Sequence, residues 1–208
     1  MLDTAARRLT GPVLDRVANR IAAAGVSPTA ITVVGWLAGI AACIAVTRAA
    51  WGVALILWLM NRLLDGLDGA VARNVGPTDL GGFLDVVADF SIYSGFVLAV
   101  ALEVPGARLA CVALLVAYYI SGTAFLALSS ILERRQLEQH RDGRSLRFVG
   151  GLAEGTETVI AYTLITLLPH HAETIIWVFT AAVAITAIQR VGEGILTLRS
   201  NVSVHASP

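Results

Sequence analysis

Hydrophobic residues along this chain are gathered into six long runs separated by short polar connections. The runs cover approximately residues 29–47, 51–72, 80–101, 107–131, 152–168 and 173–196. A helix that crosses a bilayer needs about 20 predominantly apolar residues, or fewer where it packs on neighbours. The runs lack the alternation of barrel strands, and backbone groups in hydrocarbon must be bonded within their own segment. The pattern therefore predicts an all-α integral membrane protein with six transmembrane helices.

The stretch before the first run has a different periodicity. Between residues 3 and 24, apolar residues recur every three or four positions, while arginines and aspartates occupy the rest of the surface. This spacing predicts an amphipathic juxtamembrane helix. Two placements fit it equally well, namely the headgroup layer of the membrane and the cytoplasmic face of the protein itself. Ser27 and Pro28 then have the residue types of a helix N-cap and a first helical position, which predicts the start of the first span.

The overall composition agrees with a membrane protein. The 208 residues are 56% hydrophobic and 14% charged, with a mean hydropathy of +0.74, whereas soluble domains carry about 25% charged residues. Cys43 and Cys111 both fall within apolar runs, which argues against a disulfide framework or a thiolate metal site. No repeat or second domain is indicated, so residues 1–208 are expected to form a single domain.

The distribution of arginine predicts the orientation in the membrane. All 15 basic residues are arginine, and cytoplasmic connections carry the excess of basic residues. Only Arg48 and Arg108 lie on one side, and the other side holds Arg7, Arg8, Arg16, Arg20, Arg62, Arg73, Arg134, Arg135, Arg141, Arg144, Arg147 and Arg199. We therefore expect a multi-pass protein of the cell inner (cytoplasmic) membrane, with both termini and the 132–151 loop cytoplasmic. The arginines form no single basic patch, so no nucleic-acid partner is indicated.

Charge is densest between the second and third runs, in "NRLLDGLDGAVARNVGPTDLGGFLDVVADF", residues 61–90. At 100° per residue, Asp65 and Asp68 share one helix face, and Asp85 and Asp89 share another. The linker "NVGPTDLGG" is short and rich in Gly and Pro, which predicts an antiparallel hairpin. The four carboxylates are therefore expected to converge at the cytoplasmic boundary.

Four carboxylates at this depth require cations. Each uncompensated charge costs about 2.5 kcal/mol or more at the centre of a transmembrane helix. Arg73 can offset one of them, but a divalent ion offsets two, and Mg²⁺ typically joins a few carboxylates to substrate phosphates. Glycines at 66, 69, 81 and 82 let a ligand approach the backbone closely. The pattern indicates a metal-bound phosphate ester, while Asp79 is interpreted as the cap of the third span.

These residues resemble the signature of the CDP-alcohol phosphotransferase family, DxxDGxxAR followed after eight residues by GxxxDxxxD. The matching positions are Asp65, Asp68, Gly69, Ala72, Arg73, Gly81, Asp85 and Asp89. Here seven residues separate Arg73 from Gly81, a departure confined to the interhelical loop. The chain as a whole is most similar to a branch of small bacterial members. The resemblance implies six transmembrane helices after a juxtamembrane helix, and a homodimer.

The resemblance also implies a reaction and its cofactor. A phosphatidyl group would pass from CDP-diacylglycerol to a hydroxyl-bearing acceptor, with release of CMP. Asp65, Asp68 and Asp85 would bind a pair of divalent cations, either Mg²⁺ or Mn²⁺. Asp89 would contribute to the same metal site and act as the catalytic base.

Contacts to the cytidine nucleotide and its phosphates are also implied. The positions in the signature are Gly69, Ala72, Arg73 and Gly81. A further contact is Thr32, because "SPTAIT" resembles the family's "SPNxxT", with Thr29 in place of the Asn.

Charged residues around the last two runs are candidates for binding the acceptor. They are Arg144, Arg147, Glu154, Glu157 and Arg190. Arginines suit a phosphorylated polyol such as glycerol 3-phosphate or an inositol phosphate, which the sequence slightly favours. The glutamates instead suit an amino alcohol such as serine. Structural roles in topology, helix-dipole stabilisation and ion pairing also remain open for these residues.

Two other functions use intramembrane acids. An intramembrane prenyltransferase binds Mg²⁺-diphosphate through aspartate clusters, but it typically has more spans and well-separated acidic motifs, whereas both pairs here lie within 25 residues. A small transporter would place acids near the middle of the bilayer and show inverted repeats. Neither feature of a transporter is found in the sequence.

Overall fold

The computed structural model describes residues 2–139 and 155–200. Its described residues form helices joined by short connections, without a β-strand, which confirms the all-α class. The α-helices are α1 (Leu2–Ala23), α2 (Pro28–Val46), α3 (Trp51–Val75), α4 (Asp79–Glu103), α5 (Arg108–Gln139), α6 (Gly155–Leu167) and α7 (Ala172–Ser200). Two short 3₁₀ turns, η1 (Pro105–Ala107) and η2 (Pro169–His171), precede α5 and α7.

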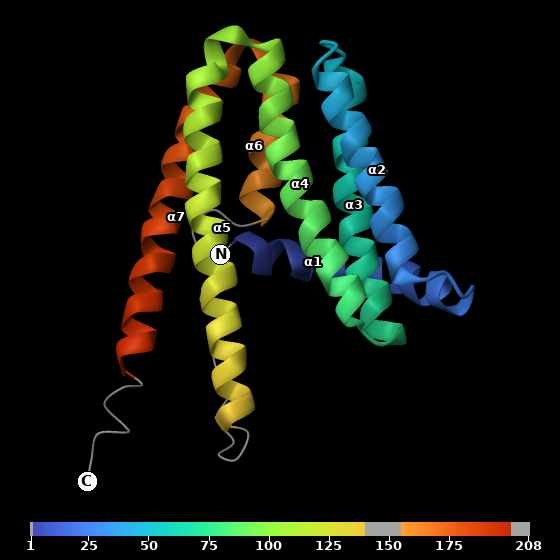
Figure 1. Cartoon of the computed structure of the whole chain (residues 1–208). Helices are drawn as coiled ribbons and strands as arrows, with labels where there is room; N and C mark the ends of the chain where they lie inside the picture. Colours follow the sequence, from blue (N-terminus) through green and yellow to red (C-terminus); the bar gives the residue numbers. More distant parts are fainter. Residues whose placement is uncertain (1, 140–154, 201–208) are drawn as a thin grey trace.

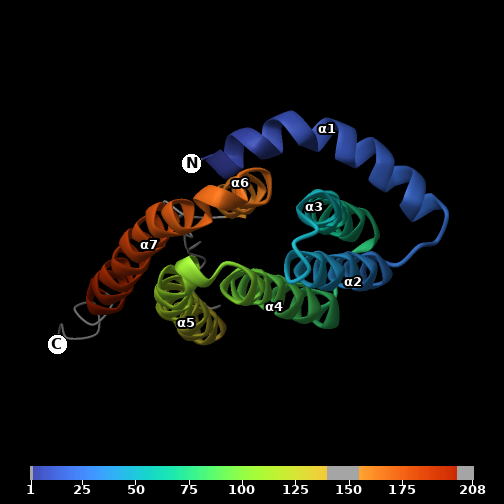
Figure 2. The ribbon, with the colours of Figure 1, turned by 90° about the horizontal axis from the view of Figure 1, so that it is seen from above.

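Helices α2 to α7 form an up-and-down bundle, and α1 runs across it (Figure 1). The α2–α3, α4–α5 and α6–α7 connections lie at one end, and the α3–α4 turn lies towards the other. Viewed from above, α1 follows one side of the bundle next to α3 (Figure 2). Helix α2 packs on both α3 and α4, while α5 packs on α7. This arrangement brings the acidic ends of α3 and α4 together.

The ends of α1 to α3 follow local residue chemistry. Ser27 is the N-cap of α2, with its Oγ accepting a hydrogen bond from the Ala30 amide at 3.2 Å, and Pro28 is the first helical residue. Both predictions at this boundary are confirmed. Gly25 follows α1 with φ of 76°, and Gly76 ends α3 with φ of 99°. Backbone at positive φ favours glycine because a Cβ atom would crowd the neighbouring carbonyl.

The cap of α4 is Thr78, and the prediction that Asp79 caps this helix is wrong. Thr78 has extended backbone angles of −124° and 150°, and its Oγ1 accepts from the Gly81 amide at 3.1 Å. Asp79 is already the first helical residue. An N-cap requires this extended geometry, so the hydroxyl one position earlier takes the role. The Asp79 carboxylate remains in the first turn, where it favours the helix dipole.

Four helical segments within the described residues are long and apolar enough to cross a membrane. They are Pro28–Val46, Asp79–Glu103, Pro105–Arg134 and Pro169–Arg199. The two remaining predicted spans fall on α3, which carries the charged motif, and on α6, which has 13 described residues. The start of the fifth predicted span, at 152, lies outside the described residues. The structure therefore supports a multi-helix membrane protein, with candidate spans at four of the six predicted positions.

Helix α5 extends past the predicted end of its span. It continues to Gln139 instead of ending near 131, so the first part of the expected 132–151 loop is helical. Its 32 residues are about 48 Å long at 1.5 Å per residue, against about 30 Å for the hydrocarbon core. The added turns read "ERRQLEQ", residues with good helix propensity that need no apolar surroundings.

The outer faces of the bundle are apolar. On α5, Leu109, Val112, Val116 and Tyr119 are all more than half exposed and follow one another at spacings of three and four. A continuous exposed stripe of this kind is unfavourable in water and fits contact with lipid or another apolar surface. On this face, apolar side chains point away from the bundle, whereas an amphipathic helix of a soluble protein exposes its polar side chains.

The interior contains an aromatic core and a smaller cluster towards α1. Trp58, Phe96 and Tyr162 are fully buried, and the last two rings stack with centroids 4.3 Å apart. Nearer the α3–α4 turn, Ala18 of α1 is fully buried against a second group that includes Leu67 and Val71 of α3. This part of α1 therefore packs on the protein itself.

Candidate metal and nucleotide site

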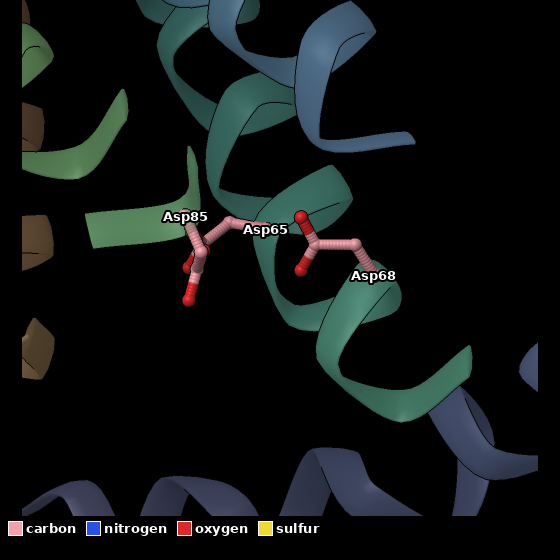
Figure 3. Close-up of side chains that lie close together, drawn as sticks. All are labelled: Asp65, Asp68 and Asp85. Carbon is pink, nitrogen blue, oxygen red and sulfur yellow. The ribbon is translucent and has the colours of Figure 1, made fainter. Parts of the chain in front are cut away.

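Three of the four predicted carboxylates converge. Asp65 and Asp68 come from α3 and Asp85 from α4, and one oxygen of each lies within 4.8 Å of the others. Figure 3 shows the three side chains turned towards a common space. Hard cations such as Mg²⁺ and Mn²⁺ prefer oxygen donors of this type. The residues present thus fit a divalent metal ion.

Asp68 is the most deeply buried of the three and is held from α2. Asp68 is 5% exposed, and its Oδ2 accepts a hydrogen bond from the Thr32 hydroxyl at 2.5 Å. Thr32 is itself buried. A hydrogen bond to an ionised carboxylate is about twice as strong as a neutral one and fixes the carboxylate orientation. The predicted contact between Thr32 and a nucleotide stays a prediction, while its contact with Asp68 is new.

Asp89 lies beside the cluster and is bonded to an arginine. Arg62 Nη2 donates to Asp89 Oδ1 at 2.8 Å, and Arg62 Nη1 lies 3.6 Å from Asp65 Oδ2. The Arg62 side chain is only 9% exposed. The group of three carboxylates that could share an ion does not include Asp89.

Arg62 is not identified as a site residue from the sequence, because this arginine is counted there only as a marker of the cytoplasmic side. Its position was informative, since Arg62 stands three residues before Asp65 on the same helical face. A charge within an apolar helix is expected to have a partner. In the structure, Arg62 and not Arg73 offsets the acids of the hairpin.

The other signature residues lie along the α3–α4 turn. Gly69, Ala72 and Arg73 occupy the last turns of α3, and Gly81 lies in the first turn of α4. Arg73 Nη2 lies 3.6 Å from Asp15 Oδ1, and both side chains are more than half exposed. An exposed pair of this kind is weak, so it leaves the Arg73 guanidinium available to a stronger anion.

Gly81 has a local structural reason as well. A Cβ atom at this position would come within 3.0 Å of the Thr78 Oγ1 that accepts its amide hydrogen bond. Glycine therefore lets the N-cap of α4 close. Whether Gly69, Ala72, Arg73 and Gly81 contact a nucleotide remains a prediction.

The acceptor candidates are only partly described. Arg144, Arg147 and Glu154 lie outside the described residues. Glu157 is in the first turn of α6. Arg190 of α7 donates from Nη1 to Ser121 Oγ of α5 at 2.9 Å, and its guanidinium carbon lies 5.3 Å from the centroid of the Phe125 ring. The Arg190 side chain of α7 is thus held against α5.

A sequence profile described as CDP-alcohol phosphatidyltransferase matches residues 25–188, most of the chain. The chain belongs to this family. The matched region includes every residue of the signature, so the resemblance inferred from the aspartates is confirmed, and the protein is a membrane transferase of the CDP-alcohol phosphotransferase class.

Related proteins extend this comparison. A relative described as inner membrane protein YnjF, from Escherichia coli strain K12, is 36% identical over 205 residues, which cover 96% of this chain and 98% of that protein. The Mycobacterium tuberculosis phosphatidylinositol phosphate synthase with CDP-DAG bound has a similar structure. Its TM-score is 0.72 at 20% identity, over 88% of this chain and 94% of that one.

The same synthase has also been solved in complex with manganese and citrate. That structure gives a TM-score of 0.72 at 20% identity, over 87% of this chain and 88% of that one. At this level of identity, the similarity establishes that the present CDP-alcohol phosphatidyltransferase shares the fold of the synthase.

Proposed function

We propose that this protein transfers a phosphatidyl group from CDP-diacylglycerol to the hydroxyl of a polar acceptor and releases CMP. The observation that carries the proposal is the convergence of Asp65, Asp68 and Asp85 within one signature of the family. The structurally similar synthase was solved with CDP-DAG bound, which supports the same donor here.

Two divalent cations, Mg²⁺ or Mn²⁺, are proposed to bind at Asp65, Asp68 and Asp85, with Asp89 nearby. The carboxylate donor set supports this, as does the manganese complex of the similar synthase. When bound, the cations neutralise negative charge on the phosphoryl oxygens and on the leaving CMP. Thr32 holds Asp68 in a fixed orientation before a cation arrives, which lowers the cost of organising the site.

Asp89 is proposed as the general base. The acceptor oxygen forms a bond to the phosphorus of the phosphatidyl group, and its proton passes to Asp89. The bond from that phosphorus to the bridging oxygen of the diphosphate breaks, and CMP leaves with the electron pair. Asp89 follows Asp85 by one helical turn, so it lies close to the three proposed metal-binding carboxylates without belonging to their group.

The nucleotide is proposed to lie along the α3–α4 turn. Arg73 would exchange its weak contact with Asp15 for the diphosphate, because guanidinium groups bind phosphate oxygens more strongly than exposed carboxylates. Gly69, Ala72 and Gly81 would allow the cytidine to approach the backbone, and Thr32 stays a candidate contact. Gly69 lies next to the proposed phosphate ligand, because a Cβ added there would be 3.7 Å from Arg73 Nη1.

For the acceptor, we favour a phosphorylated polyol such as glycerol 3-phosphate or an inositol phosphate. The support is Arg190, whose guanidinium is already oriented by Ser121. Arg144 and Arg147 would contribute further phosphate contacts. Glu154 and Glu157 favour the alternative, an amino alcohol such as serine, and a panel of acceptors separates the two.

We also propose that α3 and α6 cross the bilayer together with the four long apolar helices. Each runs alongside such helices within the same bundle, which supports six spans (Figure 1). Both termini and the acidic site would then face the cytoplasm of a cell inner membrane. The description of the E. coli relative as an inner membrane protein supports that location. A homodimer is expected from the family resemblance.

The experiment incubates purified protein with CDP-diacylglycerol, Mg²⁺ or Mn²⁺ and a panel of acceptors, and follows the release of CMP. We expect release with one acceptor class, abolition by chelation, and loss in Asp89→Asn. Asp79→Asn serves as the matched control, because this exposed aspartate is on the same helix outside the cluster. Absence of CMP with every acceptor, or full activity of Asp89→Asn, contradicts the proposal. Release of diphosphate from a prenyl diphosphate would indicate a prenyltransferase instead.

A further inference from the structure

Arg62 belongs to a buried polar network that extends beyond its contact with Asp89. Its Nε donates to Asn61 Oδ1 at 2.8 Å, and Asn61 Nδ2 donates to the Gly35 carbonyl of α2 at 2.8 Å. Asn61 is 3% exposed. The guanidinium is thus anchored to the backbone of a neighbouring helix through a side chain that cannot turn towards water.

Aromatic rings fix the plane of the same guanidinium. Its central carbon lies 4.9 Å from the centroid of the Trp58 ring and 5.0 Å from that of Tyr93. Arg62 Nη1 also donates to the Tyr93 hydroxyl at 2.8 Å. The flat guanidinium has fixed donor directions, so once Asn61, Trp58 and Tyr93 set its orientation, the direction in which Nη2 points is set as well.

Nη2 points at Asp89. It donates to Oδ1 at 2.8 Å, and the Tyr93 hydroxyl donates to Oδ2 at 3.4 Å. Arg62 and Tyr93 therefore each contact one oxygen of the Asp89 carboxylate. Asp65, in contrast, is 3.6 Å from Arg62 and keeps its place among the three converging carboxylates.

From this network we infer that Arg62, held by Asn61, is a positioning residue that fixes the orientation in which Asp89 accepts the proton of the acceptor hydroxyl. The inference rests on the proposed function, since it takes Asp89 as the base. It explains how two acids one turn apart on α4 divide their work. Asp85 faces the shared space of the cluster, while Asp89 is hydrogen-bonded to the Arg62 guanidinium.

The test compares Arg62→Gln, Arg62→Lys, Asp89→Asn and the double variant, with Arg48→Gln as the control. Arg48 is exposed in the α2–α3 connection, just after α2 ends at Val46. Activity is measured as CMP release from CDP-diacylglycerol with the acceptor identified by the panel. Mn²⁺ binding is measured without substrates by the loss of the free-ion electron paramagnetic resonance signal, and thermal unfolding is followed in detergent.

We expect Arg62→Gln to lower kcat at least about tenfold, with both KM values within about twofold of wild type. Mn²⁺ should bind at least as tightly as to wild type, because a positive charge beside the carboxylates is lost. Arg62→Lys keeps the positive charge but lacks the planar guanidinium with its fixed donor directions. We therefore expect a reduced kcat and an unchanged Mn²⁺ affinity. The double variant should have the kcat of Asp89→Asn alone, because residues that act through one another are not additive. Arg48→Gln should match wild type.

Several results would overturn the inference. They are wild-type kcat in Arg62→Gln or Arg62→Lys, additive losses in the double variant, or joint loss of Mn²⁺ binding and thermal stability in Arg62→Lys, which would show a purely structural role. If Arg62→Gln does not fold, Arg62→Lys decides by the same measures. A fully active Asp89→Asn variant contradicts the proposed base itself. An inactive Asp89→Asn variant together with a wild-type kcat in Arg62→Lys contradicts only the positioning role of Arg62.

Discussion

Thr32 and Asp68 are joined by a 2.5 Å hydrogen bond that connects α2 to the carboxylate cluster of α3 and α4. The two residues are separated by 36 positions in the chain, and both are buried. Since α2 packs on α3 and α4 alike, it acts as the support of the hairpin that carries the signature. The same helix provides the Gly35 carbonyl that anchors Asn61 and, through it, Arg62.

Replacing Thr32 by Val should weaken metal binding. The change keeps the shape but removes the donor to Asp68, and loss of such an outer partner typically costs about 10- to 100-fold in metal affinity. The measurement is the Mn²⁺ concentration that half-activates CMP release, supported by direct Mn²⁺ binding. Thr32→Ser keeps the hydroxyl and is the matched control, so equal behaviour of the Val and Ser variants would contradict the prediction.

Removing one carboxylate of the cluster should have a larger effect. In Asp85→Asn, a neutral amide replaces an anionic oxygen ligand, and we expect CMP release to fall on the order of 100-fold or more, beyond the loss seen for outer partners. Chelation of wild-type protein should abolish activity, and added Mn²⁺ should restore it. Asp79→Asn should retain activity. An active Asp85→Asn with unchanged Mn²⁺ binding would exclude this carboxylate as a ligand.

Gly39→Ala should destabilise the bundle at the contact of α2 with α3 and α4. A Cβ at Gly39 would lie 2.8 Å from two side-chain atoms of Ile92 and 3.1 Å from Asn61 Nδ2. Both neighbours are nearly fully buried, so neither has room to move. Overpacking of this kind costs about 1–3 kcal/mol, measured here as a lower midpoint of thermal unfolding in detergent.

The control for this substitution is Gly52→Ala in α3, where nothing lies within 4 Å of the added Cβ. Alanine is favoured over glycine within a helix by up to about 1 kcal/mol, so stability should be unchanged or slightly raised. A Gly39→Ala protein as stable as the Gly52→Ala protein would contradict the packing argument.

Arg190→Gln should raise the KM of a phosphorylated acceptor and leave the KM of CDP-diacylglycerol unchanged. A charge-assisted hydrogen bond contributes about 1.5–3 kcal/mol, which corresponds to about 10- to 100-fold in affinity. Arg199→Gln removes the same charge from an exposed position further along α7 and is the control. Equal effects of Arg190→Gln on both substrates would argue for a structural role of the contact with Ser121.

The sequence predicted the converging acids because helical geometry turns spacing into direction. Residues three or four apart share a face, so Asp65 and Asp68 had to point together once α3 was recognised as a helix. Ser27 and Pro28 were predictable for a similar reason, since capping depends on neighbouring residues only. Even so, Thr78 took the cap expected of Asp79, because the extended backbone angles that select the cap are not visible in the residue type.

Contacts between helices could not be read in this way. The pairs Thr32–Asp68, Arg62–Asp89 and Asn61–Gly35 each join two different helices. They depend on how far α2, α3 and α4 rotate and slide against one another. Close packing at Gly39 helps to set those positions, and a list of spacings carries no information on the resulting rotation.

By itself, the sequence determined the helical membrane class, the acidic hairpin and the family signature, because each follows from periodicity and residue order along one segment. Only the tertiary structure decided which groups each aspartate contacts, with Asp65, Asp68 and Asp85 sharing one space and Asp89 hydrogen-bonded to Arg62. The physical reason is that a buried arginine must satisfy its donors wherever packing leaves acceptors. The anchoring of Arg62 to α2 and the rings beside it selects which carboxylate it holds.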